Sequence, residues 1–268
     1  MGQVLVLNFY KLTLEYDGRF YHGFQIQKNL STIQGELHLA LEKILLSKRP
    51  DFKVKSIGSG RTDAGVHAKN QIVKIDLPFE IPTEALIKGL NALLPLDIRV
   101  KGCETCPEDF HPIYHAQSKI YEYYFYNQKR DCAFLHGKMT KFNFDFDEER
   151  LQLAMNQFIG KHDFANYQCV GTEVEHTVRE IYSFELKKFP SLEDHVFYSE
   201  YPAYYCMSIH GNGFLKQMVR LIVGASLNAA RSKIKIDDIK ESLNNPQVKK
   251  LGPTAPPEGL YLSRVIYP

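Results

Sequence analysis

The chain has 268 residues, of which 44% are hydrophobic and 24% charged, and its formal net charge is +2. This length and apolar content suffice for a large core in one domain or in two closely packed ones. No uncharged apolar run approaches the roughly 20 residues that span a bilayer, and no signal-peptide pattern begins the chain, so we expect a cytoplasmic protein. The small positive charge permits nucleic-acid binding without arguing for it.

Cysteine spacing argues against disulfide and metal chemistry. The five cysteines are scattered and odd in number, which fits reduced thiols better than a disulfide framework. Only Cys103 and Cys106 form a C-x-x-C pair, and no second pair completes a four-ligand zinc site. We therefore expect no bound metal and a structural role for these thiols.

The first part of the chain alternates strand-like and helical patterns. Residues 10–18 (YKLTLEYDG) alternate apolar and polar side chains and stop at Asp-Gly, which predicts a half-buried strand. Ser31 and Gln34 form a capping-box pattern ahead of an apolar stripe that ends at Leu45, which predicts a helix. A two-residue period returns in FKVKSIG (52–58) and QIVKIDLP (71–78), which predicts two more strands.

The alternation of strand and helix patterns repeats from about residue 117. Strand patterns occupy 118–127, 178–189 and 204–211, and amphipathic helix patterns occupy 147–160, where Gly160 would end the helix, and 212–230. These patterns predict an α+β fold of two similar α/β halves, residues 1–112 and 113–268. We expect their largely antiparallel sheets to join into one continuous sheet with helices on one face.

A polar loop, GSGRTDAGVHA at 58–68, lies between two predicted strands. Its glycines have the wrong spacing for a dinucleotide fingerprint, and a strand rather than a helix follows. A P-loop would need lysine and a hydroxyl where Val66 and His67 stand. An aspartic protease would need a second catalytic aspartate in a similar D-[ST]-G turn, and Asp63-Ala64-Gly65 offers neither. One carboxylate, Asp63, on a glycine-flanked loop remains.

This loop resembles the catalytic-loop signature of the TruA-type tRNA pseudouridine synthases. Four further segments resemble that family in the same order: EYDGRFYHGFQIQ at 15–27, DFH at 109–111, NGFLKQMVRLIVG at 212–224 and APPEGLYL at 255–262. The resemblance therefore covers nearly the whole chain, and the loop motif is highly specific.

The resemblance implies a cofactor-free isomerisation of uridine in tRNA. The N1–C1′ bond breaks, the uracil turns while held, and C5 joins C1′. Asp63 matches the family's essential aspartate. Whether it attacks C1′, adds to the uracil ring or removes the C2′ proton stays open, but each route needs an ionised carboxylate. Bacterial members modify uridines 38, 39 and 40 of the anticodon stem-loop, and we expect these targets here.

The resemblance also assigns four other site residues. Arg220 matches the arginine that pairs with the catalytic aspartate, so that the second half completes the active-site cleft. Tyr121 matches a tyrosine that stacks on the flipped base and belongs to the catalytic set. Arg61 matches an arginine that enters the RNA where the base leaves, and Leu260 an apolar residue of the same pocket. The family acts as a homodimer, with tRNA lying across both subunits.

Some positions depart from the family pattern. Phe24 stands where the family commonly has tryptophan, and Ile113 stands where it commonly has arginine. Lys119 and Ile120 replace a more basic pair. The lost cations could weaken RNA affinity or change substrate choice. We expect His67 and His111 to be loop or RNA-facing residues. The alternatives to a synthase with these targets are a catalytically weak RNA-binding or tRNA-folding protein on the same scaffold, or a synthase with other RNA targets.

Overall fold

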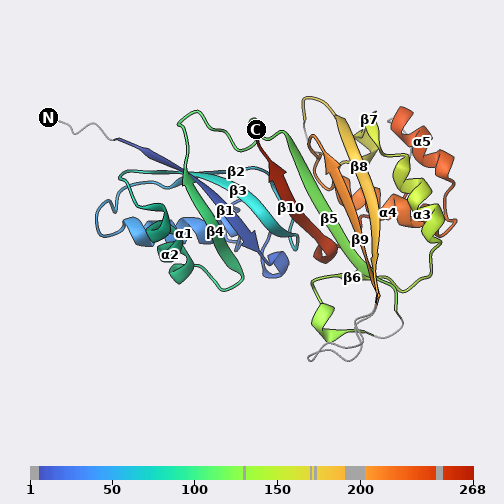
Figure 1. Cartoon of the computed structure of the whole chain (residues 1–268), viewed down its shortest axis with the longest axis horizontal. Helices are drawn as coiled ribbons and strands as arrows, with labels where there is room; N and C mark the ends of the chain where they lie inside the picture. Colours follow the sequence, from blue (N-terminus) through green and yellow to red (C-terminus); the bar gives the residue numbers. More distant parts are fainter. Residues whose placement is uncertain (1–5, 129–130, 170, 172–173, 191–202, 246–249) are drawn as a thin grey trace. The chain divides into compact units, whose positions relative to one another are not determined.

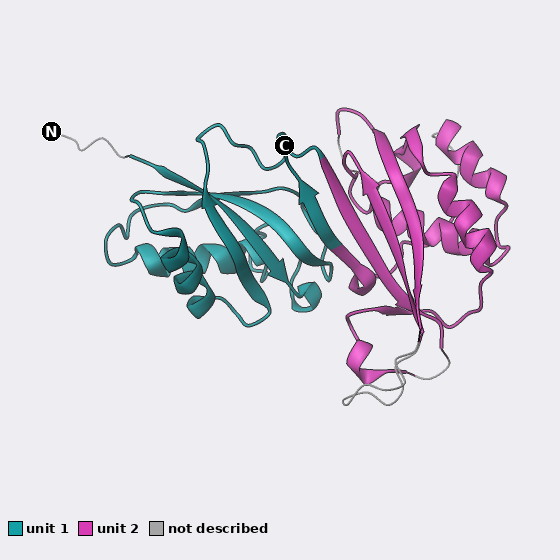
Figure 2. Ribbon diagram, in the orientation of Figure 1, with its two compact units in different colours: residues 1–117, 262–268 teal, residues 118–261 magenta. Residues whose placement is uncertain are grey.

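The computed structural model describes residues 6–128, 131–169, 171, 174–190, 203–245 and 250–268 (Figure 1). The chain divides into two compact units (Figure 2). Unit 1 extends to Gln117 and includes Leu262–Pro268, and unit 2 is Ser118–Tyr261. The sequence patterns placed the division after residue 112 and gave the end of the chain to the second half.

Unit 1 contains a sheet with the strand order β4-β1-β3-β10, and β2 also pairs with β3. β1 lies antiparallel to both of its neighbours, with Leu12 opposite Val73 of β3 and Cys103 of β4. The elements are β1 (Asn8–Tyr16), α1 (Ile33–Leu45), β2 (Lys55–Gly58), β3 (His67–Leu77), α2 (Thr83–Leu93), β4 (Ile98–Thr105) and β10 (Leu260–Ile266). A 3-10 turn, η1 (Gly18–Phe20), follows β1.

The core of unit 1 follows from alternation along β1. Leu12 and Leu14 are fully buried, while the side chain of Glu15 is exposed. α1 buries Ile33 and Leu37 from its apolar stripe, and each such burial contributes about 1.5–3 kcal/mol of transfer free energy. This packing fixes the strands that flank the polar loop.

Unit 2 contains a sheet with the strand order β5-β9-β8-β7, in which all neighbours are antiparallel. A short strand, β6, pairs parallel to β5. The elements are β5 (Ser118–Tyr126), β6 (Thr140–Lys141), α3 (Glu148–Asn156), β7 (Gly160–Asp163), β8 (Val178–Phe189), β9 (Tyr204–Gly211), α4 (Met218–Ala230) and α5 (Ile236–Asn244), with 3-10 turns η2 (Ala133–Leu135), η3 (Ala165–Tyr167) and η4 (Pro257–Gly259). The three helices group on one side of the strands (Figure 1).

The predicted α+β class is confirmed. Among the described residues there are five α-helices, and most strand pairs in both units are antiparallel. The boundary between the units falls inside β10, so one strand belongs to both. None of the helices in the described part of the chain is long and apolar enough to cross a membrane.

The predicted start of the first helix is wrong by one residue. Thr32, not Ser31, is the N-cap of α1, because its hydroxyl accepts a 3.2 Å hydrogen bond from Gly35 N–H. The Ser31 hydroxyl instead donates to Glu36 Oε1. Gln34 also has a different partner, because its side-chain amide donates to Ser56.

Two other helix boundaries are wrong. The helix predicted over 212–230 begins only at Met218, because Gln217 has a left-handed backbone with φ +63°. Phe214 therefore lies in the loop before α4. The helix predicted over 147–160 ends at Asn156, and Gly160 does not end it but begins β7, with φ +107°.

Candidate active site

The polar loop connects β2 to β3 in unit 1, and Asp63 begins a tight turn within it. Val66 N–H donates a 3.1 Å hydrogen bond to Asp63 O, which closes the turn. Gly65, the third residue of the turn, has φ +78°, a conformation that glycine adopts readily and other residues resist. The turn thus requires this glycine of the motif, and it leaves the Asp63 side chain half-buried.

Buried side chains hold the first half of the loop. Ser59 Oγ donates to Gln71 Oε1 at 2.7 Å, and Gln71 Nε2 donates to Gly60 O at 2.6 Å. Thr62 Oγ1 shares a 2.8 Å hydrogen bond with Tyr16 OH at the end of β1. Because these four side chains are buried, water does not compete for the bonds. The loop is therefore fixed directly to β3, through Gln71, and to β1, through Tyr16.

Two glycines let the segment after β1 pack directly against the loop. A Cβ on Gly18 would lie 2.0 Å from Val66 O, and a Cβ on Gly23 would lie 2.7 Å from Thr62 O. Phe24 N–H donates to the same Thr62 oxygen at 3.1 Å. No larger residue fits at either glycine without a backbone shift. Residues 18–24 are therefore a support for the Asp63 turn.

Phe24, one of the departures from the family pattern, also belongs to this support. Its side chain is buried, and a Cβ on Gly58 would lie 2.4 Å from its Cε1 atom. The ring thus covers the first residue of the loop. Phe24 therefore supports the loop by packing against its first residue.

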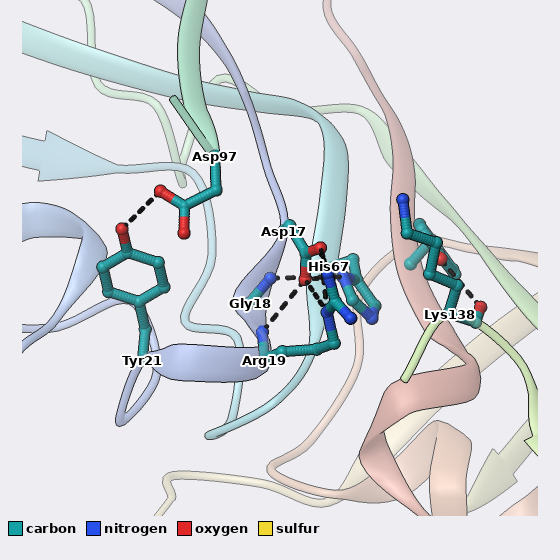
Figure 3. A network of polar contacts seen from close by, with 8 residues as sticks. Asp17, Gly18, Arg19, Tyr21, His67, Asp97 and Lys138 are labelled. Atoms are coloured by element: carbon teal, nitrogen blue, oxygen red, sulfur yellow. Dashed lines mark hydrogen bonds and ion pairs between the residues drawn. The ribbon is translucent and has the colours of Figure 1, made fainter. Parts of the chain in front are cut away.

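A charged network in unit 1 holds the same segment (Figure 3). The Asp17 carboxylate accepts a 2.7 Å hydrogen bond from the Arg19 guanidinium and a 3.2 Å bond from Arg19 N–H. Its Oδ1 lies 3.2 Å from His67 Nδ1. Burial would raise the pKa of Asp17, but the hydrogen bonds with His67 and Arg19 outweigh it and hold the pKa well below its ordinary value. Asp17 therefore stays ionised at neutral pH.

The two histidines of the motifs occupy different environments. His67 is the first residue of β3 and is only 2% exposed, and its Nδ1 lies 3.2 Å from Gly18 N. The expectation that it is a loop or RNA-facing residue is wrong, because β3 begins four residues before the predicted strand and takes the ring inside. His111 does lie in a loop, where its Nδ1 accepts a 3.2 Å bond from Ile113 N–H.

Tyr121 lies on β5 of unit 2, opposite Ile209 of β9. Its ring is 8% exposed and meets Phe214 edge-on, with 5.2 Å between the ring centroids. Edge-to-face contacts of this kind are favourable between aromatic rings. The Tyr121 ring therefore packs against the loop that precedes α4.

Arg220 is the third residue of α4 and is half-buried. Its Nε donates a 2.7 Å hydrogen bond to Ala255 O, and its own carbonyl oxygen accepts from Ala255 N–H at 3.1 Å. One turn further, a Cβ on Gly224 would lie 1.9 Å from Pro253 O. α4 thus packs in backbone contact with the segment that leads to Leu260.

Leu260 begins β10 and is buried. The residue before it, Gly259, has no room for a side chain, because a Cβ there would lie 2.7 Å from Tyr124 O of β5. The stretch from residue 255 to 260 therefore contacts Arg220 at one end and the strand of Tyr121 at the other. In this way unit 2 brings together the elements that carry its three candidate residues.

The candidate residues thus form two sets. Arg61 and Asp63 share one loop of unit 1, with Arg61 exposed, whereas Tyr121, Arg220 and Leu260 belong to unit 2. The supporting residues Asp17, Gly18 and Gly23 were not predicted as part of the site. The available signal was the pair of glycines in a segment that already matched the family.

The cysteines of the C-x-x-C pair are partly buried. Burial raises the pKa of Cys103 to about 11 and also raises the pKa of Cys106, so both thiols are protonated at neutral pH. Within the described ranges, no cluster of three or more His, Cys, Asp or Glu side chains could hold a metal ion.

Comparison with known proteins identifies the family. The family model for tRNA pseudouridine synthase matches residues 13–115 and 154–268. The chain is 38% identical to tRNA pseudouridine synthase A of Bacillus pumilus and 37% identical to that of Bacillus subtilis, over 96% of this chain and 98% of each relative. The enzyme of the same name from Limosilactobacillus reuteri is 35% identical over 96% of both chains. The chain therefore belongs to the tRNA pseudouridine synthase family of isomerases.

Proposed function

We propose that this protein converts uridine to pseudouridine in tRNA, at positions 38, 39 and 40 of the anticodon stem-loop. The observation that carries the proposal is the Asp63 turn, which presents one carboxylate from a loop held by buried side chains and two glycine contacts. Relatives that bear the name tRNA pseudouridine synthase A match 96% of the chain, which supports the same reaction.

Asp63 supplies the ionised carboxylate of the reaction. The N1–C1′ bond breaks, the uracil rotates, C5 bonds to C1′, and the proton on C5 leaves while N1 gains one, so the product is an isomer. The carboxylate acts as nucleophile at C1′ or on the ring, or as a base at C2′. No redox step or external group is required, so the proposal includes no cofactor.

The target uridine leaves the stem before it reacts. Extrusion costs a few kcal/mol, and stacking on Tyr121 offsets about 1–3 kcal/mol of that. Arg61, exposed two residues from Asp63, enters the space that the base leaves. Arg220 pairs with the catalytic aspartate and Leu260 lines the uracil pocket, as the family resemblance implies.

We also propose that the enzyme acts in the cytoplasm as a homodimer. A single chain with net charge +2 focuses little positive potential on a folded tRNA, and two chains double the basic surface. Analytical ultracentrifugation tests this proposal. A monomer with full activity at the working concentration would contradict it.

Pseudouridine mapping tests the proposed reaction and its targets. We expect tRNA from cells that lack this protein to lose pseudouridine at positions 38–40, and a plasmid copy of the wild type, but not of Asp63→Asn, to restore it. Restoration by Asp63→Asn would favour the alternative of an RNA-binding or RNA-folding protein. Loss of pseudouridine at other sites only would favour a synthase with other RNA targets.

A further inference from the structure

Two cations face the same side of the unit 2 sheet. Lys119 of β5 lies opposite Gly211 of β9, which in turn lies opposite Ile181 of β8. Arg179 is two residues before Ile181 on the same strand, and residues two apart on a strand point to the same face. Tyr121, two residues after Lys119, shares this face by the same rule.

Two glycines allow close packing beside these two side chains. A Cβ on Gly211 would lie 2.7 Å from Glu180 O and 3.2 Å from Cζ of Phe214, so the Phe214 ring packs directly over this glycine. A Cβ on Gly213 would lie 3.9 Å from Arg179 Cδ, so the arginine stem passes close to this residue. The next residue, Phe214, meets Tyr121 edge-on. Phe214 therefore contacts both the glycine that lies beside the two cations and the ring of the candidate base-stacking residue.

The surroundings of Lys119 and Arg179 disfavour the charged forms of both side chains. Burial, and secondarily the charge of Arg179, lowers the pKa of Lys119 to about 8. Burial also lowers the pKa of Arg179. The Arg179 guanidinium is fixed by hydrogen bonds to the carbonyl oxygens of Val178 at 2.7 Å and His176 at 3.0 Å. Holding two like charges partly out of water destabilises a fold, and a bound anion reverses that effect.

We propose that Lys119 and Arg179 together bind a backbone phosphate of the RNA, next to the nucleotide whose base stacks on Tyr121. This inference rests on the proposed function, because it uses Tyr121 as the base-stacking residue. A phosphodiester carries a full negative charge and accepts from both an ammonium and a guanidinium. Such a contact positions the nucleotide and carries no sequence information.

Salt-dependent binding of an unmodified tRNA transcript tests the proposal. We expect Lys119→Gln and Arg179→Gln each to raise Kd about tenfold and to reduce the slope of log Kd against log salt by about 0.7–1. The double variant should lose less than the product of the two effects, because both cations bind one phosphate. Lys119→Arg and Arg179→Lys, which keep the charges, should retain most of the slope and also control for misfolding.

Lys161→Gln is the matched control. Lys161 is exposed and lies opposite Glu180, so it points to the other face of the same sheet from Arg179. We expect this variant to bind nearly as the wild type does. Effects of Lys119→Gln and Arg179→Gln no larger than those of Lys161→Gln would overturn the proposal.

A neutral methylphosphonate, placed singly at the phosphates flanking the target uridine, locates the contact. At one position it should weaken wild-type binding about tenfold and have little effect on Arg179→Gln. Equal sensitivity of both proteins at every position would overturn the proposal. Wild-type protein that forms no pseudouridine would refute the proposed function and leave these binding results interpretable. Active wild type with unaffected variants would refute this inference alone.

Discussion

The two units hold their candidate residues in different ways. Unit 1 places Asp63 on a loop that needs outside support from Thr62–Tyr16 bonding and from the backbone contacts of Gly18 and Gly23. Unit 2 places Tyr121 on a strand and Arg220 on a helix, whose own hydrogen bonds fix the backbone. The position of a loop depends on the side chains that pack against it. Substitutions in residues 18–24, which support the Asp63 turn, should therefore impair turnover more than substitutions that only alter the packing of the strands and helices of unit 2.

The largest effect in this comparison is expected at Gly18. Gly18→Ala places a Cβ 2.0 Å from Val66 O, so the backbone of the loop must shift and displace Asp63. A displacement of about 1 Å can lower turnover about 100-fold. Single-turnover rates measure this effect, and tRNA binding should change much less.

Gly89→Ala is the control for this substitution. Gly89 lies within α2 of the same unit, and a Cβ there would make only an ordinary 3.5 Å contact with Ile44. We expect normal turnover and about 0.5–1 kcal/mol of added stability, because alanine favours helices. Equal activity of the two alanine variants would show that the loop tolerates movement.

Two substitutions at Tyr121 distinguish the contribution of ring stacking from that of the hydroxyl group. Tyr121→Ala should raise the Kd for tRNA about tenfold, because it removes a stacking contact of about 1–3 kcal/mol, and it should also lower turnover. Tyr121→Phe should bind normally but turn over slowly if the hydroxyl orients the base or moves a proton. Near-wild-type rates and affinities for both variants would remove Tyr121 from the site.

Asp17 should make the stability of unit 1 sensitive to acid. Its pKa is lowered in the folded protein, so its contribution is fully present above the unfolded value of about 3.9 and is lost as the pH falls below it. Asp17→Asn should cost about 1–3 kcal/mol at pH 7 and remove part of the acid sensitivity. Thermal melts of both proteins from pH 7 to pH 3 measure it, and parallel curves would contradict it.

The smallest expected effect, at Lys119, has the opposite sign for stability. Because its folded pKa of about 8 lies below the unfolded value of about 10.4, this group makes stability rise with pH between the two values and carries its full penalty below pH 8. Lys119→Met should therefore raise Tm at pH 7 by about 2–4 °C, and the gain should shrink towards pH 10. A lower Tm at pH 7 would show that the charged amine stabilises the fold.

Local patterns predicted the elements better than their ends. Alternation located β1 within two residues, and the apolar stripe located α1, because both signals come from core packing. Periodicity carries no information on the left-handed Gln217 that delays α4. The choice of Thr32 over Ser31 as N-cap depends on tertiary partners such as Glu36. Local patterns also do not predict that β10, at the end of the chain, pairs with the strands of unit 1.

Sequence motifs name candidate site residues, but they do not indicate residues whose roles depend on tertiary contacts. The GRTDAGVHA pattern gave Asp63 and its turn glycine. The burial of His67 beside Asp17 follows from where β3 begins, which the polar motif obscures. Lys119 and Arg179 are 60 positions apart in sequence and share a face only through the β5-β9-β8 order.

We propose that the isomerisation requires the negative charge of the Asp63 carboxylate. The most direct test is the rate of tritium release from tRNA labelled at C5 of uridine, compared for wild type and Asp63→Asn alongside filter binding of the same tRNA. The asparagine keeps the shape of the turn and removes the charge, so we expect release to fall by at least about four orders of magnitude while Kd stays nearly unchanged. Release within tenfold of the wild-type rate would contradict the claim.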